Sequence, residues 1–148
     1  MDVVSPPQSI WEIAGRLGLA TLLGAAVGLN REWEGKPAGL RTHALVALGG
    51  ALFTIIGLLL AADDASATSR ILQGITAGLG FIGGGVIMRR PDLQDVQGLT
   101  TAAAIWMVAA VGVAVGAGVW RTSLIALTLT LAVLVAGEKI DEWIHRRR

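Results

Sequence analysis

The chain has 148 residues, a mean hydropathy of +0.65 and 16% charged residues, against about 25% in soluble domains. These values exclude an ordinary soluble domain and indicate an integral membrane protein. The net charge of +1 says nothing about nucleic acid, and without a basic arm we expect no nucleic-acid partner. The absence of cysteine excludes disulfides, zinc–thiolate sites and thiol catalysis.

Five apolar stretches follow one another along the chain, at about residues 10–29, 44–62, 71–88, 99–119 and 122–140. Most approach the length of about 17–25 residues that a helix needs to cross a bilayer. They are apolar on nearly all sides, whereas a helix of a soluble bundle has one polar face. We therefore expect an all-α integral membrane protein with five transmembrane helices in a single domain, 1–148, and no soluble domain.

Basic residues are concentrated in three of the polar segments. Nine of the twelve Lys and Arg residues lie in the first loop, the third loop and the C-terminal tail, and none lies before Ile10. Since basic residues accumulate on the cytoplasmic side of a membrane, we expect the N-terminus outside and the C-terminus in the cytoplasm. Five spans, an odd number, place all three basic segments on that side.

The first span contains one oppositely charged pair, Glu12 and Arg16. The carboxylate precedes the cation by four residues, which is the favourable order on a helix. One interpretation is a pair that reaches the outer interface beside Trp11. The other is a buried ion pair that lines a path through the membrane.

Glycines recur at four-residue spacing in three spans, which lets helix backbones approach closely in lipid. The pairs that we assign to helix packing are Gly24 and Gly28, Gly74 and Gly78, Gly80 and Gly84, and Gly112 and Gly116. The triplet 83–85 also permits a local break that exposes backbone groups to an ion. Residues 78–83 match the dinucleotide fingerprint G-x-G-x-x-G, but they lie within a membrane span instead of between a strand and a helix, so we do not expect nucleotide binding.

The loop at 28–43 is the most polar stretch between two apolar runs. It is either a solvated connector that fixes the topology or a polar network at the membrane surface. A shift of the sequence by 59 residues pairs Arg31 with Arg90 and Thr42 with Thr101, with six identities over nineteen positions. The shift suggests that helices 1–2 and 3–4 form a parallel repeat, and chance similarity between glycine-rich spans is the alternative. The candidate cytoplasmic network comprises Asn30, Arg31, Glu32, Arg41, Thr42, Arg90, Asp92, Asp95, Thr100 and Thr101.

Both copies share a Gly-Leu-x-Thr element, at 39–42 and 98–101, where a helix enters the membrane. A Thr at such an end caps free amide groups, and a helix N-terminus favours anions. The two elements are therefore candidates to hold Glu32, Asp92, Asp95 or a phosphate, although capping alone accounts for them.

These motifs together resemble the MgtC/SapB family. The resemblance rests on Gly28-Leu-Asn-Arg-Glu32, the run 35–43, Gly78-x-Gly-Phe-Ile-Gly83 and the run 98–106. It implies a multi-pass protein of the bacterial inner membrane that is linked to survival at low magnesium and, in pathogens, to persistence inside host cells. Family members often have Glu where Asn30 stands. The resemblance covers the membrane domain, and we expect no counterpart of the soluble ACT-like domain of well-known members.

Two functions fit these features. The first is a membrane regulator or scaffold, not an enzyme and without a cofactor, that contacts lipid and either a second copy, as in a homodimer, or another membrane protein. The second is a transporter or channel for Mg²⁺ or another cation, which the acidic pair Asp63-Asp64 would attract. Spans two to five contain no acidic residue in their interiors, and a Mg²⁺ path usually has carboxylates or an oxygen-lined pore. The sequence does not identify a metal site.

Overall fold

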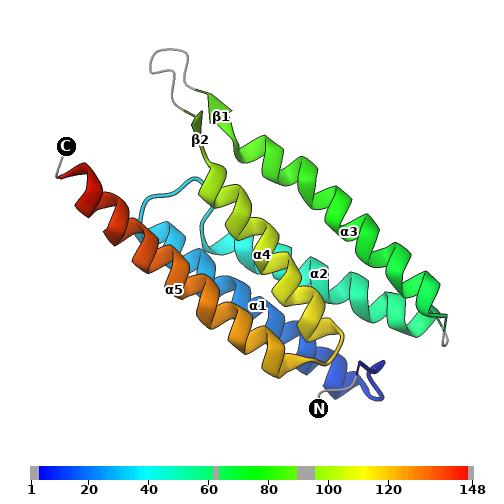
Figure 1. Ribbon diagram of the computed structural model, residues 1–148. Helices are drawn as coiled ribbons and strands as arrows, with labels where there is room; N and C mark the ends of the chain where they lie inside the picture. Colours follow the sequence, from blue (N-terminus) through cyan, green and yellow to red (C-terminus); the bar gives the residue numbers. More distant parts are fainter. Residues whose placement is uncertain (1–3, 62–63, 90–95, 147–148) are drawn as a thin grey trace.

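The computed structural model describes residues 4–61, 64–89 and 96–146. Its helices confirm the expected all-α membrane-type architecture (Figure 1). They are α1 (Ile10–Trp33), α2 (Leu40–Ala61), α3 (Ala65–Val86), α4 (Leu99–Gly116) and α5 (Trp120–His145). A short antiparallel ribbon, which the sequence did not predict, pairs β1 (Met88–Arg89) with β2 (Val96–Gln97).

Four helices of the described residues are long and apolar enough to cross a membrane: α1, α2, α4 and the part of α5 from Trp120 to Asp141. The helix α3 is as long as α2 but less apolar, because its first two turns contain polar residues such as Ser66 and Arg70. It begins at Ala65, six residues before the stretch 71–88 that we expected to span the bilayer. The five-span topology, its sidedness and the repeat stay predictions.

Local hydrogen bonds explain where two of the helices begin. The Ser9 hydroxyl accepts from the Glu12 amide at 3.2 Å and caps α1. The Asp64 carboxylate accepts from the Ser66 amide at 2.8 Å and caps α3. Hydrogen bonds from Ser66 hold the pKa of the Asp64 carboxyl below its usual value, because they stabilise the charged form.

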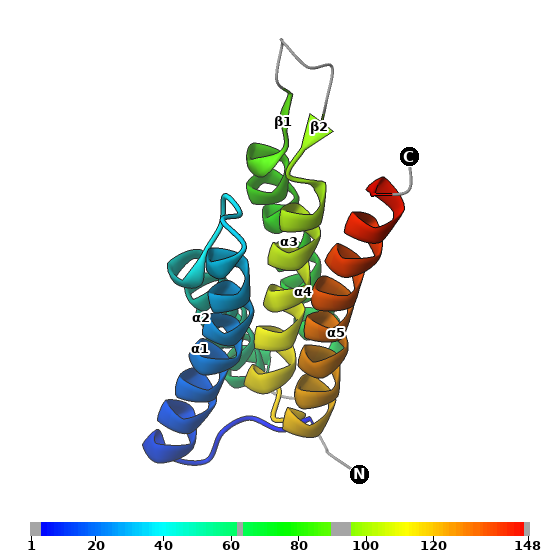
Figure 2. The same ribbon diagram turned by 90° about the vertical axis from the view of Figure 1, so that its left-hand side faces the viewer.

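The centre of the bundle is formed by α4, which contacts each of the other four helices. The pair α1–α2 packs on one side of it, while α3 lies along α2 and α4 and α5 lies along α4 and α1 (Figures 1 and 2). The core consists of small and β-branched residues, which allow the helices to approach closely. Its members include Ala20, Val27, Ala47, Ala51, Ala104, Val108 and Val115.

Three segments of the chain lie together at one end of the bundle. The α1–α2 turn, the β1–β2 ribbon and the last turns of α5 lie there, and the N-terminal segment lies at the other end with the α4–α5 turn (Figures 1 and 2). We call the first of these the ribbon end. It contains the segments that the charge distribution assigned to the cytoplasm.

Candidate functional site at the ribbon end

The centre of the ribbon end is a buried arginine in the last turn of α1. The Arg31 side chain is 3% exposed, and its Nη1 donates to Glu34 Oε2 at 2.5 Å. Asn30 Nδ2 donates to the other oxygen of the same carboxylate at 2.7 Å. The residue that joins Asn30 and Arg31 is therefore Glu34, which we did not predict although it lies three and four residues further along the helix.

Glu32 has a different role from the one that we expected. Its Oε2 accepts from the Leu40 amide at 2.9 Å, so this carboxylate caps the N-terminus of α2. A side chain at Gly39 would place its Cβ 2.6 Å from the same oxygen. Of the occupants considered for the first Gly-Leu-x-Thr element, the structure thus places Glu32 there, where a negative charge is favourable.

Other predicted members of the network lie apart from Arg31 or outside the described residues. Arg41 is exposed, and none of the ion pairs between described residues includes it. Thr42 is half-buried in the first turn of α2, Thr100 is exposed and Thr101 is buried. Arg90, Asp92 and Asp95 lie outside the described residues. Among the described residues, neither Glu32 nor Arg41 forms an ion pair with Arg31, and the larger network stays a prediction.

A second ion pair connects the α1–α2 turn with α5. Lys36 Nζ lies 3.1 Å from Glu138 Oε1, and about a third of each side chain is exposed. These residues are 102 positions apart in the sequence, so no local pattern predicts the contact. An exposed pair of this kind contributes about 0–1 kcal/mol, and it fixes the position of the turn more than it stabilises the fold.

Three buried polar atoms near this end have no hydrogen-bond partner among the described residues: Asn30 Oδ1, Arg31 Nε and His43 Nε2. His43 is fully buried, and its Nδ1 lies 3.0 Å from the Gly39 carbonyl oxygen. Because a carbonyl only accepts, Nδ1 carries the proton, and in a neutral ring Nε2 is then an acceptor. A buried polar atom without a partner is costly in the native state.

A polar cavity of about 930 Å³ opens beside Arg31. Its walls come from the α1–α2 turn, from β2 and the start of α4, and from α5. The polar side chains that line it include Arg31, Lys36, Thr100, Thr101, Glu138 and Asp141. No group of three or more His, Asp or Glu side chains within residues 4–61, 64–89 and 96–146 is arranged to hold a metal ion.

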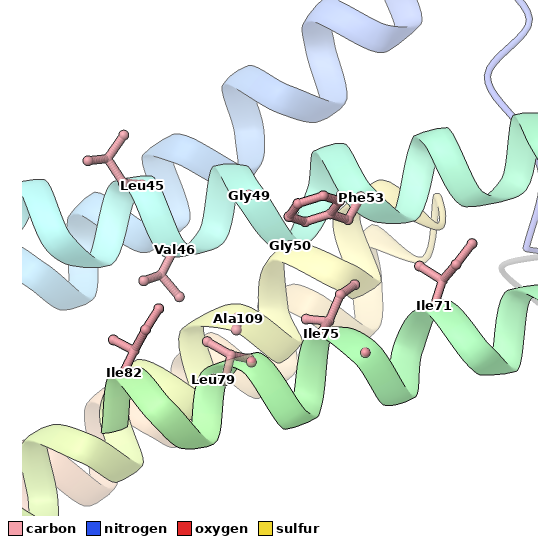
Figure 3. Close-up of a pocket in the computed structure, with 12 residues that line it drawn as sticks. Leu45, Val46, Gly49, Gly50, Phe53, Ile71, Ile75, Leu79, Ile82 and Ala109 are labelled. Atoms are coloured by element: carbon pink, nitrogen blue, oxygen red, sulfur yellow. The ribbon is translucent and has the colours of Figure 1, made fainter. Parts of the chain in front are cut away.

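An apolar cavity of about 720 Å³ lies between α2 and α3, with Ala109 of α4 in its wall. Figure 3 shows the side chains of Val46 and Phe53 on α2 and of Ile75 and Leu79 on α3 around this space. Gly74 and Gly78 also line it, yet neither has an atom within 4 Å of the place where a Cβ would stand. The cavity is therefore open where we expected the glycines of α3 to pack.

The predicted packing glycines fall into two groups. A Cβ at Gly24, Gly28 or Gly116 would lie 2.5–2.6 Å from a backbone atom of α2, and one at Gly112 would overlap the Ala47 carbonyl oxygen. Gly74, Gly78, Gly80 and Gly84 have no such neighbour within the described chain. Packing by this second group stays a prediction about contacts with another molecule.

The pair Glu12–Arg16 lies at the opposite end of the bundle. Arg16 Nη2 is 2.5 Å from Glu12 Oε1, while Nη1 donates to the carbonyl oxygens of Ser5 at 2.8 Å and Gly116 at 2.7 Å. The arginine thus joins the N-terminal segment and α1 to the C-terminal end of α4, where a positive charge is favourable. Arg16 therefore acts as a clamp between the N-terminal segment, α1 and α4. Neither sequence-based interpretation included this role.

Comparison with known proteins places this arrangement in a family. The family model described as "MgtC family" matches residues 17–143, which include most of α1, all of α2, α3 and α4, and the ribbon-end side chains. The chain belongs to the MgtC family. It is 40% identical to SrpB of Synechococcus elongatus, an alignment that covers 99% of this chain and 87% of SrpB. No solved structure shows significant similarity to the chain.

Two longer relatives of this MgtC-family chain come from enteric bacteria. YhiD of Escherichia coli K12, which is described as a candidate magnesium transporter, is 42% identical over 80% of this chain and 57% of its own length. MgtC of Salmonella typhimurium LT2 is 43% identical over 86% of this chain and 52% of its own length. The chain thus spans little more than half of these two proteins. Family membership and the four apolar helices together establish a membrane protein.

Proposed function

We propose that this protein is a regulator or scaffold of the bacterial inner membrane that serves magnesium homeostasis through helix contacts. Its family and the description of YhiD support the link to magnesium. The proposed helix contacts are based on one surface, the outer face of α3, which we define as Gln73, Thr76, Gly80 and Gly84. All four residues are exposed.

The composition of this face suits protein better than lipid. Glycine exposes backbone and offers little surface to acyl chains, while a polar side chain such as Gln73 is costly in hydrocarbon unless it has a partner. The α5 helix presents the opposite composition, with Ile125, Leu129 and Val133 all more than 60% exposed. We infer that α5 faces lipid and that α3 contacts a second copy of the chain or another membrane protein.

Cross-linking in native membranes tests this assignment. The chain has no cysteine, so a single cysteine introduced by Thr76→Cys reports contacts on α3 alone, and Leu129→Cys on α5 is the matched control. We expect a cross-linked homodimer or a cross-linked partner from the α3 position and none from the α5 position. Equal cross-linking at both positions, or none at α3, would contradict the proposal.

A growth assay at low magnesium connects the contact with the function. Gly80→Leu and Gly84→Leu fill the outer face, and we expect both to abolish complementation of a strain that lacks the protein. Gly15→Leu and Gly18→Leu are matched controls, because these α1 glycines also have no atom within 4 Å. Full complementation by the α3 variants would sink the proposed contact.

The alternative function is transport of Mg²⁺ or another cation, which the description of YhiD favours. Purified protein in liposomes distinguishes the two functions through Mg²⁺ flux relative to empty vesicles. A regulator gives no flux above that background. Saturable Mg²⁺ flux above that background would replace the regulatory proposal with the transport function.

A further inference from the structure

One side of α1 is exposed from its first turn to its last. Trp11, Leu22 and Trp33 lie on this side, and they are 82%, 68% and 80% exposed. Each is eleven residues from the next, which is close to three turns of a helix, so the three side chains are aligned along the axis. The other side of α1 packs in the bundle, where Ala20 and Val27 are fully buried.

The aligned side carries no polar side chain over most of its length. Within residues 12–31 the exposed residues are Ala14, Gly15, Gly18, Leu22 and Ala26. The outer face of α3 differs, because it includes the polar side chains of Gln73 and Thr76. A polar side chain is costly in hydrocarbon unless it has a partner, and α1 avoids that cost. We call Trp11, Trp33 and the exposed residues of this list the tryptophan face of α1.

The length of this face matches the thickness of a bilayer. Trp11 and Trp33 are 22 residues apart, which corresponds to about 33 Å along the helix axis. The hydrocarbon core of a typical bilayer is about 30 Å thick. Both indole rings therefore reach the boundary between hydrocarbon and headgroups, where tryptophan is enriched. Leu22, halfway between them, then lies at the centre of the hydrocarbon.

The α5 helix has the same arrangement. Trp120 is its first residue and Trp143 lies near its end, 23 residues or about 35 Å further along. Both are about half exposed, and exposed Leu129 and Val133 lie between them. Since α1 and α5 run in the same direction through the bundle (Figures 1 and 2), each end of the bundle has one tryptophan from each helix.

Cations lie beside the rings at both ends. The Arg121 guanidinium stacks on Trp120, with 5.3 Å between its central carbon and the ring centre. Lys36 follows Trp33 by three residues at the ribbon end. Lipid phosphates are negative and lie just outside the hydrocarbon, so cations next to interfacial indoles complement them. The charges thus agree with the two levels that the helix lengths assign to the membrane surfaces.

We propose that the tryptophan face of α1 contacts phospholipid and that four tryptophans fix the position of the bundle in the bilayer. Trp11 and Trp120 lie at one membrane surface. Trp33 and Trp143 lie at the other, and Leu22 lies at the midplane. The proposal does not depend on whether the outer face of α3 binds a second copy or another protein, since that face belongs to a different helix.

Spin labels measure the depth of this face. Gly18→Cys, Leu22→Cys and Ala26→Cys each introduce a single cysteine, because the chain has none. The labelled proteins are placed in liposomes of phosphatidylcholine and phosphatidylglycerol. Electron paramagnetic resonance then compares the access of oxygen, which partitions into hydrocarbon, with that of a water-soluble nickel chelate. We expect the deepest position at residue 22, with both other labels about 6 Å along the axis nearer to water.

A matched variant on α5 provides an independent depth. Ala132→Cys lies midway between Trp120 and Trp143 and is exposed, so its label should have the same depth as that of Leu22→Cys. A deepest position on α1 other than residue 22, or different depths for the two midpoint labels, overturns the proposal. A label at residue 22 that is shielded from both reagents overturns it as well, because that result indicates a protein contact.

Fluorescence quenching tests the four rings themselves. The chain has five tryptophans, so Trp106→Phe on α4 leaves only the four proposed anchors. This variant is compared in liposomes whose phosphatidylcholine carries bromine either next to the headgroup or near the end of the acyl chain. We expect stronger quenching by bromine next to the headgroup, since all four rings lie at membrane surfaces. Equal or stronger quenching by bromine near the chain end would overturn the assignment.

Discussion

The hairpins α1–α2 and α3–α4 have similar sequence patterns but different packing. In the first, Gly24 and Gly28 lie against the backbone of α2, and Glu32 closes the N-terminus of that helix. In the second, α3 contacts α4, but a Cβ at Gly80 or Gly84 would meet no described atom within 4 Å, and the first residues of α4 line the polar cavity. Glycine spacing therefore identifies a surface that permits close approach, but it does not identify the partner.

The largest effect that we expect is from Arg31→Ala, which tests how far the first hairpin depends on its polar contacts. The substitution leaves Glu34, whose side chain is 13% exposed, without its cation. Removal of one partner from a buried pair costs about 3–5 kcal/mol. Reversible unfolding in detergent micelles measures the loss. Arg41→Ala is the control, and an equal loss in both variants would refute a specific role for the buried pair.

A pair of Gly→Ala substitutions tests the packing difference directly. Gly112→Ala places a methyl group against the backbone of Ala47, and overpacking of this kind costs about 1–3 kcal/mol. Gly80→Ala meets no atom and should stabilise α3 by about 0.5–1 kcal/mol, since Ala is the better helix former. Thermal unfolding of both variants shows whether each substitution lowers or raises the stability. Destabilisation by Gly80→Ala would show that α3 already packs against something in the purified protein.

A smaller effect is expected where Glu32 caps α2. Glu32→Gln keeps the length of the side chain and removes the charge that faces the helix N-terminus, so we expect a loss of about 0.5–1 kcal/mol. In this variant the amides in the first turn of α2 should exchange faster, while the exchange rates in α5 stay constant. Unchanged exchange at Leu40 would argue against the cap.

The smallest effect concerns pH and the start of α3. Hydrogen bonds from Ser66 lower the pKa of Asp64 from its ordinary value of 3.8, so the folded state favours the charged carboxylate. Its contribution is therefore present above the unfolded pKa and is lost as the pH falls through the lower folded pKa. We expect faster amide exchange at residues 66–68 below about pH 4. Asp64→Asn retains a capping side chain and should abolish this pH dependence, and a dependence that persists would assign it to another group.

The sequence predicted the helices well because apolar runs of membrane length are long-range patterns. It placed the start of α3 too late, since Ser66 and Arg70 lower the hydropathy although Asp64 caps the helix before them. The ribbon was missed because strands of two residues have no period to detect. Arg31 was predicted from its place in the polar loop, and Glu34 was within reach of the same helical spacing.

Other parts of the site have no sequence signal that we can identify. Lys36 and Glu138 meet only because the bundle brings the first turn beside α5. His43 was noted only as a residue of the loop, and its burial depends on how closely α1 and α2 approach. The target of Arg16 is the carbonyl oxygen of Gly116, and every residue has such a group, so the sequence does not distinguish it.

The clamp formed by Arg16 also has a consequence for biogenesis. Its acceptor on Gly116 lies 100 residues further along the chain, and at about 5–20 residues per second it is synthesised roughly 5–20 s after Arg16. During that interval the arginine has Glu12 and Ser5 as partners, but not α4. The end of the bundle opposite the ribbon end therefore closes only after α4 has been synthesised, and a nascent chain that stalls before that point leaves α1 without this contact.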